Sequence, residues 1–232
     1  MPRQIELNST RKPIRSYVRR EGRLTQGQKK ALQELWPKYG VSDDQSPLDA
    51  TGLFLDDRPI ILEIGFGNGQ NLVNLALANP AIGYVGVDVH RPGAGHLLLE
   101  LSRLDITNIR VVLQDALEAV PVRFSEHTLH SILVYFPDPW PKKRHHKRRL
   151  LRFDFIHELA RRLIFHGTLN IATDCDDYAS NILELIEKEP LLENVAGPRC
   201  YAERPKDRSL TRYEMRGMHL GHPVRDILAR RL

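Results

Sequence analysis

The length, composition and charge of this chain are those of a globular protein with one sizeable core. It has 232 residues, of which 41% are hydrophobic and 27% charged, and these values are ordinary for one large α/β domain. No apolar stretch approaches the roughly 18 residues that a membrane-spanning helix needs. Only two cysteines occur, Cys175 and Cys200, so a disulfide framework or a structural zinc site is disfavoured and we expect a cytoplasmic protein.

The charge is modest in total but uneven along the chain. Lysine plus arginine exceeds aspartate plus glutamate by 34 − 29 = +5, with a pI of about 9.3, which alone says little about partners. However, seven of the eleven residues from Lys142 to Arg152 are lysine or arginine. Such a run is typical of a nucleic-acid contact, although the solvated start of a helix is an alternative.

The N-terminal residues 1–45 are expected to form a basic arm and a short helix, ahead of a main domain at 46–232. Residues 1–20 are polar and basic, which suits either a disordered tail or an arm that orders on ligand binding. Thr25 precedes a helical pattern at 26–36 and is a suitable cap. Pro37 is expected to end that helix.

From residue 59 onward, strand-like and helical patterns alternate. The expected strands are 59–64, 84–87, 109–113, 129–136 and 167–173, and the expected helices are 71–78, 92–104, 115–119, 150–165 and 178–188. Residues 192–195 and 212–219 are candidates for two further strands, paired as an antiparallel hairpin at the sheet edge. This order predicts an α/β fold with a doubly wound, mostly parallel sheet covered on both faces.

Ligands of such a sheet bind at the carboxyl ends of its strands, and acidic residues stand there in this chain. The first turn contains Gly65, Gly67 and Gly69, but its third glycine comes one residue too early for a dinucleotide-binding turn. Glu63, just before that turn, would repel a pyrophosphate but suits a ligand that carries an ammonium group.

Two further strand-end acids complete a candidate cofactor site. Asp88 is placed to accept hydrogen bonds from ribose hydroxyls, and Asp115 could accept from an adenine amino group. Together with Glu63 they describe S-adenosylmethionine, which is cationic and has no phosphates. The alternatives are a purely structural glycine turn and an Asp115 that only caps the following helix. His90 is more often a turn or packing residue than a catalyst.

The fourth strand ends abruptly at Pro137-Asp138-Pro139-Trp140-Pro141, and the basic run follows at once. Prolines restrict this turn, so Asp138 is held in place, and Trp140 could either stack on a base or pack beneath the loop. The basic run would follow a phosphate backbone. His145 and His146 are not expected to bind a metal, because a third ligand is not apparent.

These motifs resemble the bacterial tRNA (guanine-N7-)-methyltransferase family. The specific parts are Phe136 to Lys142, the basic run, Ala172-Thr-Asp174 and Thr211-Arg-Tyr-Glu214, and the match extends from about residue 13 to the C-terminus. The resemblance implies a Rossmann-like class I methyltransferase fold with seven strands. It also implies S-adenosylmethionine as the cofactor and a guanine in the variable loop of tRNA as the substrate.

The resemblance also assigns residues. It implies cofactor contacts at Glu63, Asp88, Asp115 and Asp138 beside the glycine turn, and substrate contacts at Lys142, Asp174, Thr211, Arg212, Tyr213 and Glu214. It implies RNA contacts along the basic run, at Arg144, Lys147, Arg148 and Arg149. One departure is Asp88, because many family members have glutamate there. The shorter side chain reaches less far toward the ribose.

Guanine N7 carries an exposed lone pair and no proton, so in-line attack on the methyl group needs no general base. We expect Asp138 to stabilise the purine cation that develops. An amino-group methyltransferase acting on DNA or rRNA and a non-catalytic RNA-binding protein are the alternatives. Amino-group methyltransferases have two prolines at this turn, but in this chain Asp138 is followed by only one. A non-catalytic RNA-binding protein would not need acids at the strand ends. The sequence leaves open whether the chain is a monomer or a homodimer.

Overall fold

The computed structural model describes residue 16 and residues 22–44, 46–206, 208, 214 and 223–232. Its centre is a seven-stranded sheet with the order β3-β2-β1-β4-β5-β7-β6. The strands are β1 (Ile60–Ile64), β2 (Gly83–Val87), β3 (Ile109–Val112), β4 (Leu129–Tyr135), β5 (Leu163–Thr173), β6 (Leu192–Asn194) and β7 (Arg225–Arg231). Strands β1 to β5 pair in parallel, and β7 runs antiparallel to both β5 and β6. The predicted fold is confirmed.

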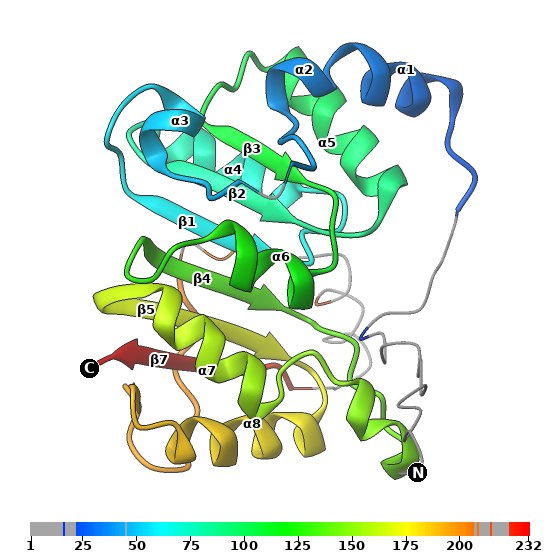
Figure 1. Cartoon of the computed structure of the whole chain (residues 1–232). Helices are drawn as coiled ribbons and strands as arrows, with labels where there is room; N and C mark the ends of the chain where they lie inside the picture. Colours follow the sequence, from blue (N-terminus) through cyan, green and yellow to red (C-terminus); the bar gives the residue numbers. More distant parts are fainter. Residues whose placement is uncertain (1–15, 17–21, 45, 207, 209–213, 215–222) are drawn as a thin grey trace, which may run out of the picture.

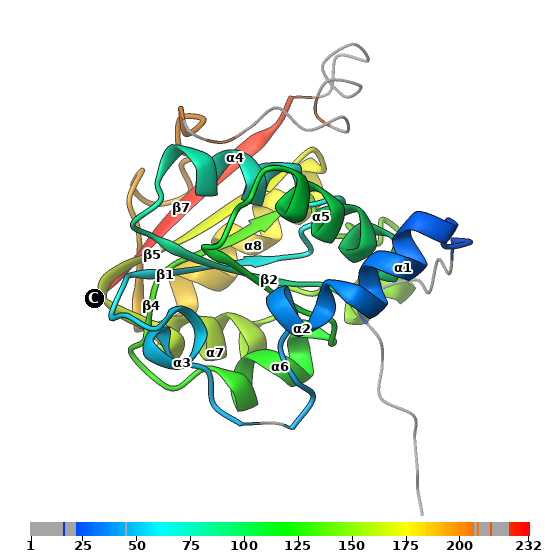
Figure 2. The same cartoon turned by 90° about the horizontal axis from the view of Figure 1, so that it is seen from above.

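Helices cover the sheet in two layers. Helices α4 (Gln70–Ala78) and α5 (Arg91–Arg103) lie on one face, and α6 (Ala116–Arg123), α7 (Phe153–Arg162) and α8 (Asp176–Lys188) lie on the other. Figure 2 shows α4 and α5 above the sheet and α6 and α7 below it. Each layer encloses its own group of buried apolar side chains, as expected when both faces of a parallel sheet are covered. Because β1 to β5 run parallel, their carboxyl ends meet along one edge of the sheet (Figure 1).

The N-terminal helices pack onto this domain. Helix α1 (Gln26–Glu34) begins with a capping box in which the Thr25 side chain and that of Gln28 each bond the other's backbone N–H. Pro37 does not end the helical segment as expected; it lies in the first turn of α2 (Trp36–Tyr39), where its missing N–H costs nothing. A Cβ on Gly95 of α5 would lie 2.8 Å from Gln28, so this glycine lets α1 approach α5 closely.

Several elements differ from the sequence prediction, and among them α6 continues to Arg123 instead of ending at 119. Helix α3 (Ala50–Phe54) lies in a stretch expected to be a loop, and α7 ends at Arg162 because β5 already begins at Leu163. The seventh described strand is β7 at Arg225–Arg231, a segment that the sequence did not predict as a strand. Apart from Glu214, residues 212–219 lie outside the described residues. β7 lies next to the edge strand and carries four charged side chains. These charges hide the alternation of apolar and polar residues that would indicate a strand.

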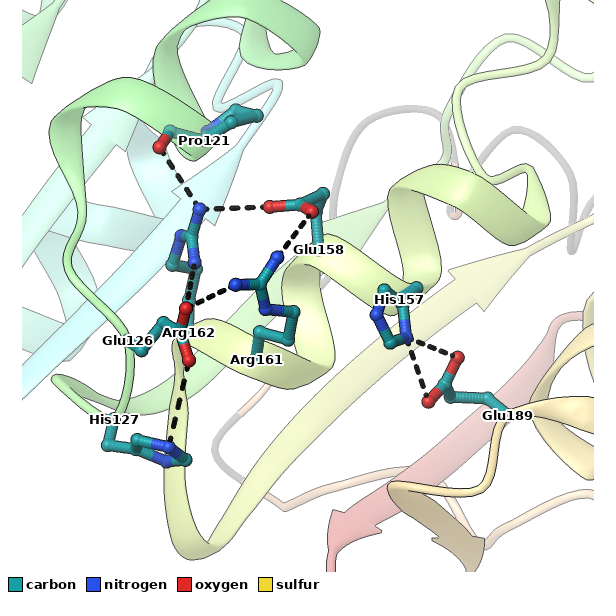
Figure 3. A network of polar contacts seen from close by, with 8 residues as sticks. All are labelled: Pro121, Glu126, His127, His157, Glu158, Arg161, Arg162 and Glu189. Atoms are coloured by element: carbon teal, nitrogen blue, oxygen red, sulfur yellow. Dashed lines mark hydrogen bonds and ion pairs between the residues drawn. The ribbon is translucent and has the colours of Figure 1, made fainter.

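A network of ion pairs fixes the end of the sheet opposite the strand ends that carry the acids (Figure 3). The buried guanidinium of Arg162 donates to the Pro121 carbonyl at 3.0 Å and to Glu158 at 2.9 Å. Arg161 pairs with Glu126 and Glu158. These contacts join α6 to α7 at the start of β5, so they stabilise the scaffold and not the site.

Candidate active site

The turn after β1 is held open by its glycines. Gly65, Gly67 and Gly69 have φ values of 76°, 60° and 80°, in the left-handed region that other residues rarely enter. A Cβ on Gly69 would also lie 2.6 Å from Leu97, whereas one on Gly65 or Gly67 would meet nothing within 4 Å. The turn thus packs on α5 at one end and presents bare backbone to open space at the other. A ligand can approach the backbone closely there.

Asp88, at the end of β2, ties this turn to the next one. Its Oδ2 accepts a hydrogen bond from the Gly67 N–H and its Oδ1 accepts one from the His90 N–H, both at 2.9 Å. The side chain is half-buried, and each carboxylate oxygen keeps a further lone pair for a ribose hydroxyl. His90 caps α5, since its Nδ1 accepts from the Gly93 N–H at 3.2 Å. The structure therefore gives His90 a capping role.

Glu63 is a buried carboxyl group beside the glycine turn. It is 4% exposed, and its Oε2 accepts a hydrogen bond from the Asn71 side-chain amide at 3.0 Å. Burial raises the pKa of Glu63 to about 7, and the charge of Asp88 adds to this while the Asn71 hydrogen bond opposes it. A nearby cation would stabilise the ionised form. This acid therefore fits the positively charged cofactor expected from the sequence.

Asp115, at the end of β3, caps α6. Its Oδ1 accepts a hydrogen bond from the Leu117 N–H at 3.0 Å, and the side chain is half-buried. The capping role that the sequence left open is thus present. The contact of Asp115 with an adenine amino group stays a prediction.

The turn after β4 contains two strained residues. Phe136 and Trp140 have φ values of 53° and 46°, a conformation that costs a non-glycine residue about 1–2 kcal/mol. The Phe136 N–H donates to the Ala172 carbonyl at 2.8 Å, which fixes the turn against β5. Asp138 lies between the two strained residues and is exposed, as is Asp174 just beyond the end of β5. Parallel pairing of β4 with β5 makes these two strand ends neighbours.

Trp140 packs against protein on several sides. Its indole Nε1 donates to the carbonyl of Ser16 at 3.0 Å, the guanidinium of Arg148 lies 5.0 Å from the ring centroid, and His145 meets the ring edge-on at 5.9 Å. Of the two roles that the sequence left open, the structure shows the packing role. A buried backbone carbonyl from the N-terminal arm thereby contacts the turn that carries Asp138.

Most of the basic run is exposed. It forms η1 (Lys143–Arg148), a 3₁₀ helix whose lysine and arginine side chains lie in solvent together with Lys142. The pKa of His145 is lowered by desolvation and then by the neighbouring cations, first Arg144. Arg149 departs from the expected phosphate contact, because it is 3% exposed and its guanidinium faces α8. A buried, paired guanidinium cannot meet a phosphate in this arrangement.

Of the late segment expected to bind substrate, Thr211, Arg212 and Tyr213 lie outside the described residues. Glu214 is 2% exposed, and its carboxylate accepts hydrogen bonds from Arg208 at 2.8 and 2.9 Å and from Arg204 at 3.1 Å. The Arg208 guanidinium is buried as well; it pairs with Asp226 of β7 at 3.1 Å and lies 5.7 Å from the Phe136 ring centroid. Glu214 is thus linked to the end of β4 through Arg208.

The sequence analysis did not single out Arg208, which is buried in the structure. Nothing in a loop rich in proline and charge indicates that one arginine of several will be buried. Within the described ranges, no group of three or more histidine, cysteine, aspartate or glutamate side chains could hold a metal ion. The same part of the chain contains no helix long and apolar enough to cross a membrane.

Comparison with known proteins identifies relatives over almost the whole chain. Residues 57–227 match the family model described as "Putative methyltransferase". The chain is 45% identical to a tRNA (guanine-N(7)-)-methyltransferase of Alkalilimnicola ehrlichii over 100% of this chain and 98% of the relative. It is 46% identical to that of Halorhodospira halophila, over 93% of this chain and 94% of the relative.

A solved structure shares the fold. A putative methyltransferase from Streptococcus mutans in complex with SAH superposes with a TM-score of 0.50 and 13% sequence identity, covering 76% of this chain and 90% of that one. At this identity the likeness concerns the fold alone.

Proposed function

Since this chain belongs to the tRNA (guanine-N7-)-methyltransferase family, we propose that it transfers a methyl group from S-adenosylmethionine to N7 of a guanine in the variable loop of tRNA. The observation that carries the proposal is the place of Asp138. It is an exposed carboxylate on a strained turn, with the acidic strand ends on one side and a basic 3₁₀ helix on the other.

The residues around the glycine turn fit the cofactor. Glu63 offers a carboxylate to a cation, Asp88 offers lone pairs to ribose hydroxyls, and the open side of Gly65 and Gly67 leaves room for a ligand without phosphates. When bound, S-adenosylmethionine supplies an electrophilic methyl group on a sulfonium. The fold neighbour from S. mutans holds SAH, the product that remains when that methyl group has left.

The protein's task at the base is orientation and charge stabilisation. Guanine N7 has a free lone pair, so no proton must be removed before it reacts, and holding the two reactants in line supplies much of the acceleration. A fixed carboxylate at Asp138 stabilises the positive charge that develops on the purine. It can also accept hydrogen bonds from guanine N1–H and the amino group, which adenine cannot offer in the same way. Lys142 and Asp174 lie exposed beside it and are proposed to contact the substrate.

The tRNA backbone is proposed to lie along η1. Arg144, Lys147 and Arg148 are exposed there and can each contact a phosphate, which positions the RNA without reading its sequence. A protein that modifies tRNA in this way works where tRNA is, and we place it in the cytoplasm.

The decisive experiment incubates the purified protein with methyl-labelled S-adenosylmethionine and total tRNA that lacks 7-methylguanosine, and then analyses the nucleosides. Label is expected in 7-methylguanosine. A transcript in which 7-deazaguanine replaces guanine is the matched control and should stay unlabelled, since it lacks only the nitrogen that reacts. Label in N6-methyladenosine would support the amino-group alternative, and no transfer to any tRNA would reject the proposal.

Asp138→Asn tests the assigned role of the carboxylate. The substitution keeps size and shape but removes the charge, and we expect kcat to fall by about 100-fold or more, the scale on which losing one electrostatic stabiliser slows a reaction. The melting temperature reports whether the fold is intact. A kcat near that of the original protein would remove Asp138 from the mechanism.

A further inference from the structure

The last cation of the basic run differs from those before it. Lys143, Arg144, Lys147 and Arg148 are exposed on η1, whereas Arg149 is 3% exposed. Arg149 leaves the 3₁₀ helix with an extended backbone, at φ −55° and ψ 137°, and its side chain lies against α8. The run of charge in the sequence therefore contains two kinds of residue, and only the exposed kind can meet a phosphate.

Helix α8 holds the Arg149 guanidinium through three successive contacts. The Asp177 carboxylate accepts a hydrogen bond from Nη2, the Asn181 Oδ1 accepts one from Nη1 at 3.4 Å, and the Tyr178 ring centroid lies 4.7 Å from Cζ. The hydrogen bond with Arg149 is the main reason that the pKa of Asp177 lies below its ordinary value. The pair is thus ionised at neutral pH, and the guanidinium is fixed in one plane.

Nη2 also lies 3.2 Å from the His146 Nε2, and the Nε of Arg149 points to the turn that carries Asp138. This Nε donates to the Pro139 carbonyl at 2.9 Å, one residue beyond Asp138. The turn has a residue of positive φ at each end, Phe136 and Trp140, and a backbone of this kind keeps its shape only when surrounding contacts impose it. Phe136 is held by β5 and Trp140 by Ser16. Arg149 holds the middle of the turn.

We propose that Arg149 is a positioning residue for methyl transfer and not an RNA contact: it joins the Pro139 carbonyl to α8 and so holds Asp138 in place beside the base. The inference rests on the proposed function of Asp138. Lysine cannot take over this role, because an ammonium group is a single point of charge. The planar guanidinium instead donates to Pro139, Asp177 and Asn181 from one rigid group.

The test separates turnover from RNA affinity. Arg149→Lys keeps the charge, and in the full chain we expect kcat to fall about 10-fold or more, as when a reacting group is slightly misplaced, while the tRNA dissociation constant changes less than twofold. The slope of log affinity against log salt should not change. Arg144→Ala, in the same run, is the matched control: there the tRNA dissociation constant should rise, and the salt slope should fall by about one unit.

Thermal melting and S-adenosylmethionine affinity would reveal whether Arg149→Lys misfolds. A second variant tests the inference in that case. Asp177 is 67% exposed at its side chain, so Asp177→Asn should fold; we expect it to lower kcat by about threefold with unchanged tRNA affinity, since one guanidinium partner is weakened. Unchanged kcat in Asp177→Asn together with unchanged kcat or misfolding in Arg149→Lys would overturn the inference. A reduced salt slope in Arg149→Lys would show that Arg149 is a phosphate contact after all.

Asp138→Asn, measured in parallel, keeps the two proposals distinguishable. If Asp138→Asn is inactive and Arg149→Lys is fully active, only the role of Arg149 is rejected. If Asp138→Asn keeps its kcat, the proposed role of Asp138 fails, and the role of Arg149 fails with it.

Discussion

Two of the buried glutamates, Glu214 and Glu63, have different kinds of partner. Glu214 accepts hydrogen bonds from the guanidinium groups of Arg208 and Arg204, so its charge is compensated within the protein. Glu63 accepts instead from the neutral amide of Asn71, and its pKa is raised to about 7. A buried acid that has no cationic partner among the described residues gains most when a cationic ligand arrives. The difference points to Glu63 as the acid that responds to the cofactor.

The pH dependence of cofactor binding follows from this pKa. A cation is attracted to the ionised carboxylate, and the ionised fraction of a group with a pKa of about 7 rises about tenfold from pH 6 to pH 8. S-adenosylmethionine affinity should therefore increase over this range, as measured by calorimetry. Glu63→Gln is the control, and the difference between the two profiles isolates Glu63 from titration of the ligand's amino group. Parallel profiles would contradict the assignment.

The raised pKa of Glu63 makes the stability of the cofactor-free protein fall with rising pH, whereas cofactor affinity rises. The folded pKa of Glu63 is raised above the value of 4.5 expected for an exposed glutamate, so the folded protein binds more protons than the unfolded chain between these two values. The contribution of Glu63 to stability is therefore fully present below pH 4.5 and is lost as the pH rises through about 7. The cofactor should offset this loss.

Contacts with neighbouring elements hold the short basic helix η1 in one position. Its first residues follow the Asp138 turn directly, and Arg148 stacks on Trp140 of that turn while Arg149 closes the helix on α8. In the proposed function, this exposed cluster of cations on a fixed support would hold the RNA backbone at a defined distance from Asp138.

Removing two exposed charges from η1 should weaken tRNA binding through electrostatics alone. We expect the double variant Arg144→Ala/Lys147→Ala to lose about one to two units of the slope of log affinity against log salt, because each phosphate contact releases counterions. Filter binding at several salt concentrations measures this slope. S-adenosylmethionine affinity is the internal control, and an unchanged slope would place the RNA elsewhere on the protein.

At the scale of the molecule, the sequence predicted the sheet well where strands are buried on both faces. Runs such as Ile60–Ile64 and Gly83–Val87 are mostly apolar, with Glu63 as the exception, because helices cover both sides of the sheet, and such runs are distinctive. β7 was missed because it carries Arg225, Asp226, Arg230 and Arg231, so the charged residues hide the inward-facing Ile227 and Ala229. Acids at the strand ends were found because topology alone brings parallel strand ends together.

The buried arginines could not be predicted in the same way. Arg148 and Arg149 are adjacent in the sequence, yet Arg148 is exposed, whereas Arg149 is buried between α8 and the Asp138 turn. Arg208 likewise has no local pattern that separates it from Arg204. Whether a guanidinium is buried depends on partners such as Asp177 and Asp226 that come from distant elements. The residues next to an arginine in the sequence do not indicate which distant partners it will have.

The packing of Trp140 gives the protein a built-in optical probe. The chain has two tryptophans, and Trp36 lies in α2 beside β3, away from the Asp138 turn (Figure 1). In a Trp36→Phe variant the tryptophan emission would come from Trp140 alone, with Arg148 against its ring and the Ser16 carbonyl at its N–H. When RNA draws Arg148 toward a phosphate, that emission should change during a tRNA titration, and Arg148→Ala should abolish the change. The binding event could then be followed in real time without any attached dye.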